Sequence, residues 1–145
     1  MFSKFPLGIS ALLLLSSSSA MADFDLRYNK QIRCLQENIY HESRGEPLSA
    51  RKAVAEVTLR RSNTKGYPKD VCGVVSQYKQ FSWVKKKHPV NDKHAWKLAR
   101  IAAVEVYRGF THPVTKHAIY FNHVSYGKRF PTQTKPIVIG KLEFY

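Results

Sequence analysis

The sequence predicts an α+β domain that is mainly helical and carries a small antiparallel β-sheet near its C-terminus. Two observations carry this prediction. Between residues 30 and 109, apolar residues recur at helical spacing in segments whose ends are marked by glycines, prolines and capping residues. After residue 117 the pattern changes to short runs rich in β-branched and aromatic residues, which is typical of strands.

The first 22 residues have the composition of a cleavable export signal. Lys4 precedes an apolar stretch at 9–15, which is followed by a serine run and by small residues up to Ala22. The apolar stretch has about half the length that spans a bilayer, so cleavage after Ala22 is favoured over a permanent anchor. Residues 23–145 suffice for one compact domain, and we expect a monomer in the periplasm or outside the cell.

The chain is strongly basic, with 24 Lys and Arg against 10 Asp and Glu and a formal net charge of +14. Loss of Lys4 with the signal lowers this charge to +13. Such a surface attracts anions, and an exported protein meets those of the cell envelope rather than nucleic acid. The basic residues are spread along the chain, and the single run at 85–87 is typical of a solvated loop.

Four helices are expected. The first covers 30–40 after a leader without regular structure at 23–29, and Gly45 and Pro47 separate it from the second at 49–61. Asp70 caps a short third helix, and Asn91 or Asp92 caps the fourth and longest, which ends near Gly109. On the second helix, the side expected to face the core carries Ala53, Val54, Val57 and Leu59. The side expected to face solvent carries Arg51, Lys52, Arg60 and Arg61.

Three further features complete the expected fold. The strands are expected at 118–121, 136–140 and 142–145. The buried stripe of the fourth helix is expected to be Trp96, Ala99, Ala103, Val106 and Tyr107. Cys34 and Cys72 form an even pair, which in an oxidising compartment favours a disulfide over two buried free thiols.

Glu42 is the candidate catalytic residue. It stands where an amphipathic helix ends and directly before a glycine-containing turn, whereas most other carboxylates have a structural role available as caps or helix-surface groups. Cleavage of a glycosidic bond needs a proton donor, and a glutamic acid desolvated against apolar walls such as Tyr40, Phe81 and Trp83 has the raised pKa that this requires. The alternative from composition is a surface ion pair with Arg44 or a lysine.

Other chemistries have weaker support. The histidines include no His-Glu-x-x-His pair, two cysteines cannot make a structural zinc cluster, and no Gly-x-Ser-x-Gly is present. A metal site from His112, His117 and His123 remains a lesser possibility, because these positions lie in turn or strand context. We expect neither a metal nor an organic cofactor.

Four blocks of sequence together resemble the SleB-type, spore-cortex-lytic family of cell wall hydrolases. The first runs from Cys34 to Pro47 and contains Ile39-Tyr40-His41-Glu42-Ser43-Arg44-Gly45-Glu46-Pro47. The other three are Ala53-Val54-Ala55-x-Val57-x-Leu59-x-Arg61, Tyr67-Pro68-x-x-Val71-Cys72-x-Val74-Val75-x-Gln77 and Gln80-Phe81-Ser82-Trp83. The resemblance implies a lysozyme-like fold over 23–145 and cleavage of peptidoglycan by a glutamate that acts as acid and base.

The resemblance also implies site residues. Glu42 matches the catalytic glutamate of the family, and the pair Glu42-Ser43 is similar to the Glu-Ser of soluble lytic transglycosylases. Substrate contacts are expected from Tyr40, Ser43, Gln80, Phe81, Ser82, Tyr120 and Asn122. The sequence departs from the family pattern at Leu142, where members often have histidine, and at Arg60, where they commonly have asparagine.

The expected reaction is cleavage of the β-1,4 bond between N-acetylmuramic acid and N-acetylglucosamine in peptidoglycan. Because no second catalytic acid is evident, the one-carboxylate route of a lytic transglycosylase is favoured over a hydrolytic muramidase. Glu46 is the nearest second carboxylate, although a structural role suits it better. A non-catalytic exported protein that binds the cell wall is the other alternative, and a cytoplasmic nucleic-acid binder would require an unused signal.

Overall fold

The computed structural model describes residues 15–77, 79–86, 88–109, 113–127 and 135–145. Most of the expected signal (residues 1–14), Lys87 of the basic run and His112 therefore lie outside the described residues. The chain divides into two compact units, residues 1–30 and residues 31–145. No helix in the described part of the chain is both long enough and apolar enough to span a membrane.

The first unit contains the N-terminal part of α1 (Leu15–Ser43). The expectation of an irregular leader at 23–29 is wrong, because these residues are helical. They include neither glycine nor proline, and side chains four apart interact along the helix. Arg27 Nη2 lies 3.1 Å from Asp23 Oδ2, and the rings of Phe24 and Tyr28 stack with centroids 6.4 Å apart.

In the second unit, the local signals set most helix boundaries correctly. After the end of α1 come α2 (Leu48–Ser62), α3 (Val71–Ser76), the short 3₁₀ helix η1 (Ser82–Lys85) and α4 (Lys93–Tyr107). Asp70 Oδ1 accepts a hydrogen bond from Gly73 N, and Asp92 Oδ1 accepts one from Ala95 N, both at 2.8 Å. Gly109, at φ +73°, donates its N–H to Val106 O and ends α4 as expected.

The core of this unit is built by apolar side chains from all four α-helices. Ile32, Leu35 and Ile39 of α1 are fully buried, as are Val54 and Val57 of α2. On α4 the buried side chains are Ala95, Ala99, Ala102, Ala103 and Val106, whereas Trp96 and Tyr107 are half-buried. The expectation that α4 is the longest helix is wrong, because α1 has 29 residues and α4 has 15.

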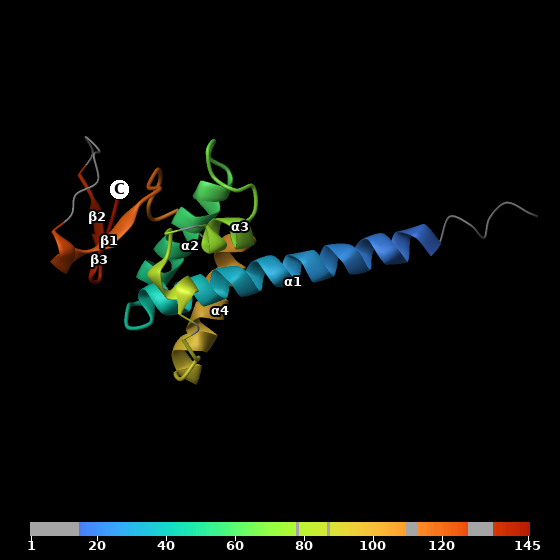
Figure 1. The fold of residues 1–145 in the computed structure, drawn as a ribbon, viewed down its shortest axis with the longest axis horizontal. Helices are drawn as coiled ribbons and strands as arrows, with labels where there is room; N and C mark the ends of the chain where they lie inside the picture. The colour runs from blue at the N-terminus through green and yellow to red at the C-terminus, as the bar shows by residue number, and fades with distance from the viewer. Residues whose placement is uncertain (1–14, 78, 87, 110–112, 128–134) are drawn as a thin grey trace, which may run out of the picture. The chain divides into compact units, whose positions relative to one another are not determined.

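The predicted antiparallel sheet is present in the described residues. It contains β1 (Phe121–His123), β2 (Ile137–Ile139) and β3 (Leu142–Phe144) in the order β1-β3-β2, and it lies at one edge of the second unit (Figure 1). Phe121 and Ile137 both pair with Phe144. The second and third strands lie where they were expected, whereas the first, expected at 118–121, begins only at Phe121.

The turn between β2 and β3 lies against the segment that follows Glu42. Lys141 N donates to Glu46 Oε2 at 2.9 Å. Gly140 has φ +60°, and a side-chain carbon at this position would overlap Glu46 Oε2 and touch Pro47. Only glycine therefore suits this turn.

The disulfide between Cys34 and Cys72 joins α1 to α3, with Cα atoms 5.2 Å apart. The pair closes a sequence separation of 38 residues that contains the Glu42 turn and α2. By the chain-entropy estimate such a cross-link stabilises the fold by about 4 kcal/mol. The expected pairing is thus confirmed.

Candidate active site

Glu42 lies on the last turn of α1 and lines an open cavity. The helix ends one residue later, where Ser43 Oγ donates to Ile39 O at 2.7 Å and Glu46 N donates to Ser43 O at 3.0 Å. The cavity has a volume of about 550 Å³. Its described lining is Glu42, Lys79, Gln80, Phe81, Ser82, Asn122 and Tyr126.

The environment of Glu42 disfavours its charge. Burial raises the pKa of Glu42 to about 7, although the positive charge of Arg61 and the indole N–H of Trp83 both act to lower it. Trp83 lies close enough to favour the ionised form, but its Nε1 makes no hydrogen bond of ordinary geometry in the described part of the chain. A carboxyl group in this state exchanges its proton near neutral pH.

Arg61 is buried, so the expectation that it lies on the solvent-facing side of α2 is wrong. Its side chain is 3% exposed, and Nε donates to Ile119 O at 2.7 Å. The guanidinium carbon lies 5.7 to 5.9 Å from the centroids of four rings, those of Tyr67, Phe81, Tyr120 and Phe121. These rings stabilise the cation by cation–π attraction and keep it beside Glu42.

Arg51 is the second buried arginine of α2, and it too was expected on the solvent-facing side. It is 3% exposed and donates to three backbone carbonyls, those of Arg44, Glu46 and Ala95. Two of these carbonyls belong to the turn that follows Glu42. Arg51 therefore fixes the end of α1, which carries Glu42, a role that short-range sequence patterns do not reveal.

The structure brings four of the seven expected substrate contacts into the cavity: Gln80, Phe81, Ser82 and Asn122. Tyr120 is half-buried and faces the Arg61 cation instead. Lys79 and Tyr126 also line the cavity and were not expected, because Lys79 lies on a turn and Tyr126 in the short 3₁₀ helix η2 (Val124–Tyr126), where no periodic pattern marks them.

Tyr40 and Ser43 do not line the cavity. The Tyr40 side chain is 1% exposed, and its hydroxyl accepts hydrogen bonds from the N–H groups of Asn91 and Asp92, both at 3.1 Å. Ser43 is 2% exposed and bonds its own helix. Their expected role as substrate contacts is therefore replaced by a structural one.

Glu46 is not among the described residues that line this cavity. Its Oε2 accepts the N–H of Lys141, which ties the turn after α1 to the β2–β3 turn. Among the described residues that line the cavity, Glu42 is the single carboxylate. No three His, Cys, Asp or Glu side chains gather as metal ligands in the described part of the chain, and His112 of the weaker metal alternative is not described.

Comparison with known proteins decides the family. The profile of a cell wall hydrolase family matches residues 45–145. The chain belongs to this family of cell wall hydrolases. The matched segment begins three residues after Glu42, so the assignment of Glu42 depends on the geometry described above.

Individual members of the family are similar in sequence and fold. The spore cortex-lytic enzyme of Bacillus subtilis is 32% identical over 113 residues, which are 78% of this chain, and the chain spans about a third of the length of that relative (34%). The catalytic domain of the Bacillus cereus SleB protein superposes with a TM-score of 0.65 at 27% identity, covering 80% of this chain and 89% of that domain.

A second solved structure agrees. The catalytic domain of the germination-specific lytic transglycosylase SleB from Bacillus anthracis gives a TM-score of 0.60 at 26% identity, covering 79% of this chain and 92% of that domain. The expected family resemblance and the α+β fold class are thereby confirmed. Membership of a family of cell wall hydrolases supports the expectation of an enzyme that cleaves glycosidic bonds.

Proposed function

We propose that this protein is an exported peptidoglycan-degrading enzyme that cleaves the bond between N-acetylmuramic acid and N-acetylglucosamine as a lytic transglycosylase. The observation that carries the proposal is Glu42, a carboxyl group with a pKa of about 7 and the single carboxylate among the described lining residues of its cavity. A two-carboxylate hydrolysis needs a partner on the opposite side of the bond. One glutamate suffices for the intramolecular route.

In the proposed mechanism, protonated Glu42 gives its proton to the glycosidic oxygen as the bond to muramic acid C1 breaks. The resulting carboxylate then takes the proton of the muramic acid 6-hydroxyl, whose oxygen bonds to C1 and closes a 1,6-anhydro ring. Glu42 ends protonated, ready for the next cycle. A pKa of about 7 serves both steps, because neither form of the group is strongly disfavoured at neutral pH.

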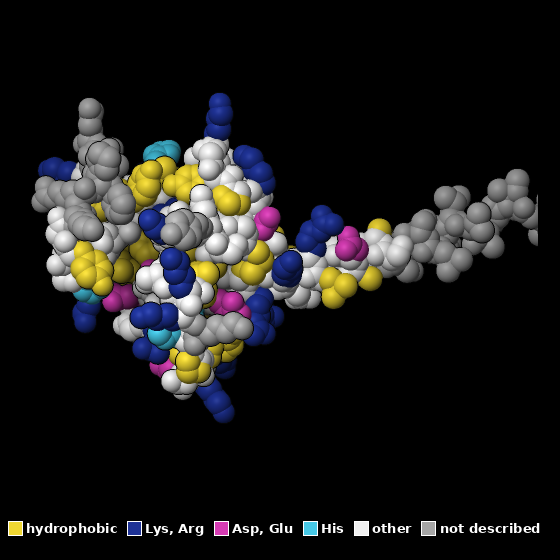
Figure 2. Space-filling model, viewed as in Figure 1, with side chains coloured by type: hydrophobic (Ala, Val, Ile, Leu, Met, Phe, Trp, Pro, Cys, Tyr) yellow, Lys and Arg dark blue, Asp and Glu magenta, His cyan; other side chains and the backbone are white. Residues whose placement is uncertain are grey.

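The other lining residues suit a sugar substrate. Gln80, Ser82 and Asn122 offer amide and hydroxyl groups that hydrogen-bond sugar hydroxyls and acetamido groups, and Phe81 and Tyr126 offer ring faces to the apolar sides of pyranose rings. The surface charge supports an anionic target. Lys and Arg side chains are spread over the visible face rather than gathered in one patch (Figure 2), which suits a polymer of the cell envelope.

In this proposal, residues 1–22 direct export and are then removed. The expected cleavage point after Ala22 falls within α1. In this region the side chains of Met21, Phe24 and Leu26 are 64%, 63% and 72% exposed. The first described core residue is Ile32, so removal of residues 1–22 takes away no described core side chain. N-terminal sequencing of the protein from a periplasmic or secreted fraction is expected to begin at Asp23.

Mass spectrometry of the fragments released from purified cell walls tests the reaction. The proposal predicts products that end in 1,6-anhydromuramic acid. Products that end in reducing muramic acid identify a muramidase and contradict the transglycosylase route. Wall binding without any released fragment contradicts an enzymatic role, and points to a wall-binding protein.

A further inference from the structure

A second cavity of about 520 Å³ lies beside the proposed catalytic cavity. The walls are largely apolar and include the Cys34–Cys72 disulfide, Val75, Val84 and Val90. Trp83 and Trp96, the two tryptophans of the chain, also line it. All of its lining residues belong to the unit 31–145. The reaction proposed for Glu42 does not use this cavity.

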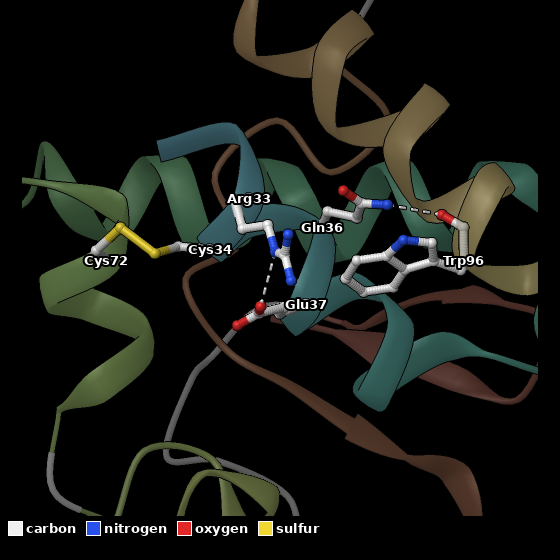
Figure 3. Close-up of polar contacts among 6 residues, drawn as sticks. All are labelled: Arg33, Cys34, Gln36, Glu37, Cys72 and Trp96. Atoms are coloured by element: carbon white, nitrogen blue, oxygen red, sulfur yellow. Dashed lines mark hydrogen bonds and ion pairs between the residues drawn. A yellow bond between two sulfur atoms is a disulfide. The ribbon is translucent and has the colours of Figure 1, made fainter. Parts of the chain in front are cut away.

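Charged groups of both signs stand at one wall of the second cavity. Arg33 Nε lies 3.1 Å from Glu37 Oε1 on successive turns of α1, and the two side chains lie between the disulfide and Trp96 in Figure 3. The Arg33 guanidinium carbon is 5.7 Å from the centre of the Trp96 ring. The Arg33 side chain is 68% exposed, so its terminal Nη groups are accessible to a carboxylate of a ligand. Lys86 adds a second positive charge to the lining.

The two cavities share the elements that separate them. Ser82 of η1 lines the catalytic cavity, and the next residue, Trp83, lines the second cavity. On α1, Glu42 lines the first cavity and His41 the second, where its ring stacks on Trp83 with centroids 4.4 Å apart. Neighbouring residues of η1 and of α1 thus line the two cavities, which therefore lie close to each other.

We propose that the second cavity binds the short acidic peptide that branches from muramic acid in peptidoglycan. This inference rests on the proposed function, which places a muramic acid residue beside Glu42. The peptide branch leaves the sugar from the lactyl group of that residue, close to the bond that is cleaved. Its methyl groups match the apolar walls, its carboxylates match Arg33 and Lys86, and an amino group matches Glu37. An unbranched glycan chain carries no such carboxylates.

Direct binding tests this site without any enzymatic turnover. Both tryptophans line the cavity, so their fluorescence emission reports its occupancy. Titration with a soluble stem peptide released from cell walls is expected to change the emission of the wild-type protein and of Arg33→Gln, with binding to Arg33→Gln weaker by about fivefold or more. Arg27→Gln is the matched control, because Arg27 forms a similar 3.1 Å pair on the same helix but does not line the cavity. An unchanged emission up to millimolar peptide overturns the proposal.

Activity on two substrates provides the second test. Peptide-bearing glycan strands are compared with strands from which an amidase has removed the peptides. The wild-type enzyme is expected to prefer peptide-bearing strands, and Arg33→Gln and the cavity-filling variant Ser76→Phe are expected to lower kcat/KM on these strands alone, chiefly through KM. An equal loss on both substrates overturns a peptide site. Peptide binding without cleavage of either substrate refutes the proposed function and leaves the binding site standing.

Discussion

Two glutamates of neighbouring helices, Glu42 and Glu56, are both withdrawn from water, yet their surroundings differ in kind. Glu56 is 6% exposed, and its carboxylate accepts hydrogen bonds from Val114 N, Thr115 N and Thr115 Oγ1 at 2.6 to 3.1 Å. Glu42 is half-buried, and no described N–H or O–H group bonds its carboxylate with ordinary geometry.

The difference separates a carboxylate that holds structure from one that is available for chemistry. A carboxylate that accepts several hydrogen bonds from a loop stabilises that loop. A carboxylate that loses water without gaining donors is held near the balance between its two forms. Burial alone therefore does not distinguish the candidate acid Glu42 from Glu56, whereas the number of hydrogen-bond donors around each carboxylate does.

The largest expected effect that tests the contrast is the loss of activity in Glu42→Gln. Removal of the proton donor is expected to lower kcat on purified cell walls by at least about 100-fold, because the amide cannot protonate the leaving oxygen. Turbidity clearance measures the rate, and circular dichroism checks the fold. Glu105→Gln is the matched control, because Glu105 is half-buried on α4, pairs with Lys52 and does not line the cavity, and this variant should retain wild-type activity. Substantial clearance by Glu42→Gln refutes the assignment.

The same substitution is expected to stabilise the protein at alkaline pH. In the folded state Glu42 keeps its proton up to about pH 7, whereas in the unfolded chain it ionises near 4.5. The folded state thus binds more protons in this window, and the free energy of unfolding falls as the pH rises through it, by about 3 kcal/mol at most. Urea unfolding at pH 9 should show Glu42→Gln as more stable than wild type, with no difference at pH 4.

Substitution of Glu56 is expected to lower stability and to leave activity nearly unchanged, the reverse of the effects expected for Glu42→Gln. Glu56→Ala leaves the N–H groups of Val114 and Thr115 without their acceptor, which should lower the free energy of unfolding by about 2 kcal/mol. At temperatures where the variant is folded, its kcat on cell walls should remain near the wild-type value. A loss of kcat comparable to that of Glu42→Gln contradicts the purely structural role of Glu56.

The smallest expected effect is a shift in pH dependence when Arg61 is replaced. Activity needs protonated Glu42, so it should fall as the pH rises through about 7. The charge of Arg61 lowers the pKa of Glu42, so Arg61→Met should raise that pKa and extend activity to higher pH. Arg61→Lys keeps the charge and should restore a profile near that of wild type. An unchanged alkaline limit in Arg61→Met shows that Arg61 acts only as a packing residue.

The parts of the fold that the sequence predicted correctly depend on local chemistry. The caps Asp70 and Asp92 and the stop at Gly109 act on backbone groups within a few residues, so their effect is readable from spacing alone. The position of Glu42 at a helix end is of the same kind. The disulfide was predictable because the chain has two cysteines and therefore one possible pairing.

The parts that the sequence did not predict depend on distant partners. Arg61 is buried because it bonds a carbonyl 58 residues away, and Arg51 is buried partly because it bonds one 44 residues away. Nothing near either arginine in the chain distinguishes it from the solvent-facing Arg and Lys that helices commonly carry. Tyr40 was misassigned for the related reason that an aromatic ring beside a catalytic residue suits both a cleft and a core.

The close approach of Gly140 to Glu46 has a consequence for how the enzyme varies. One wall of the catalytic cavity is the end of α1, which carries Glu42, and the other includes Asn122 of the sheet. The β2–β3 turn meets the segment after Glu42 at Gly140 and Lys141, so it joins the segment that follows one wall to the sheet that carries the other. A methyl group at position 140 would require the Glu46 carboxylate, which accepts the Lys141 N–H, to move. Substitution at position 140 is therefore expected to disturb the contact between the segment after Glu42 and the sheet, although Gly140 is not among the described residues that line the cavity.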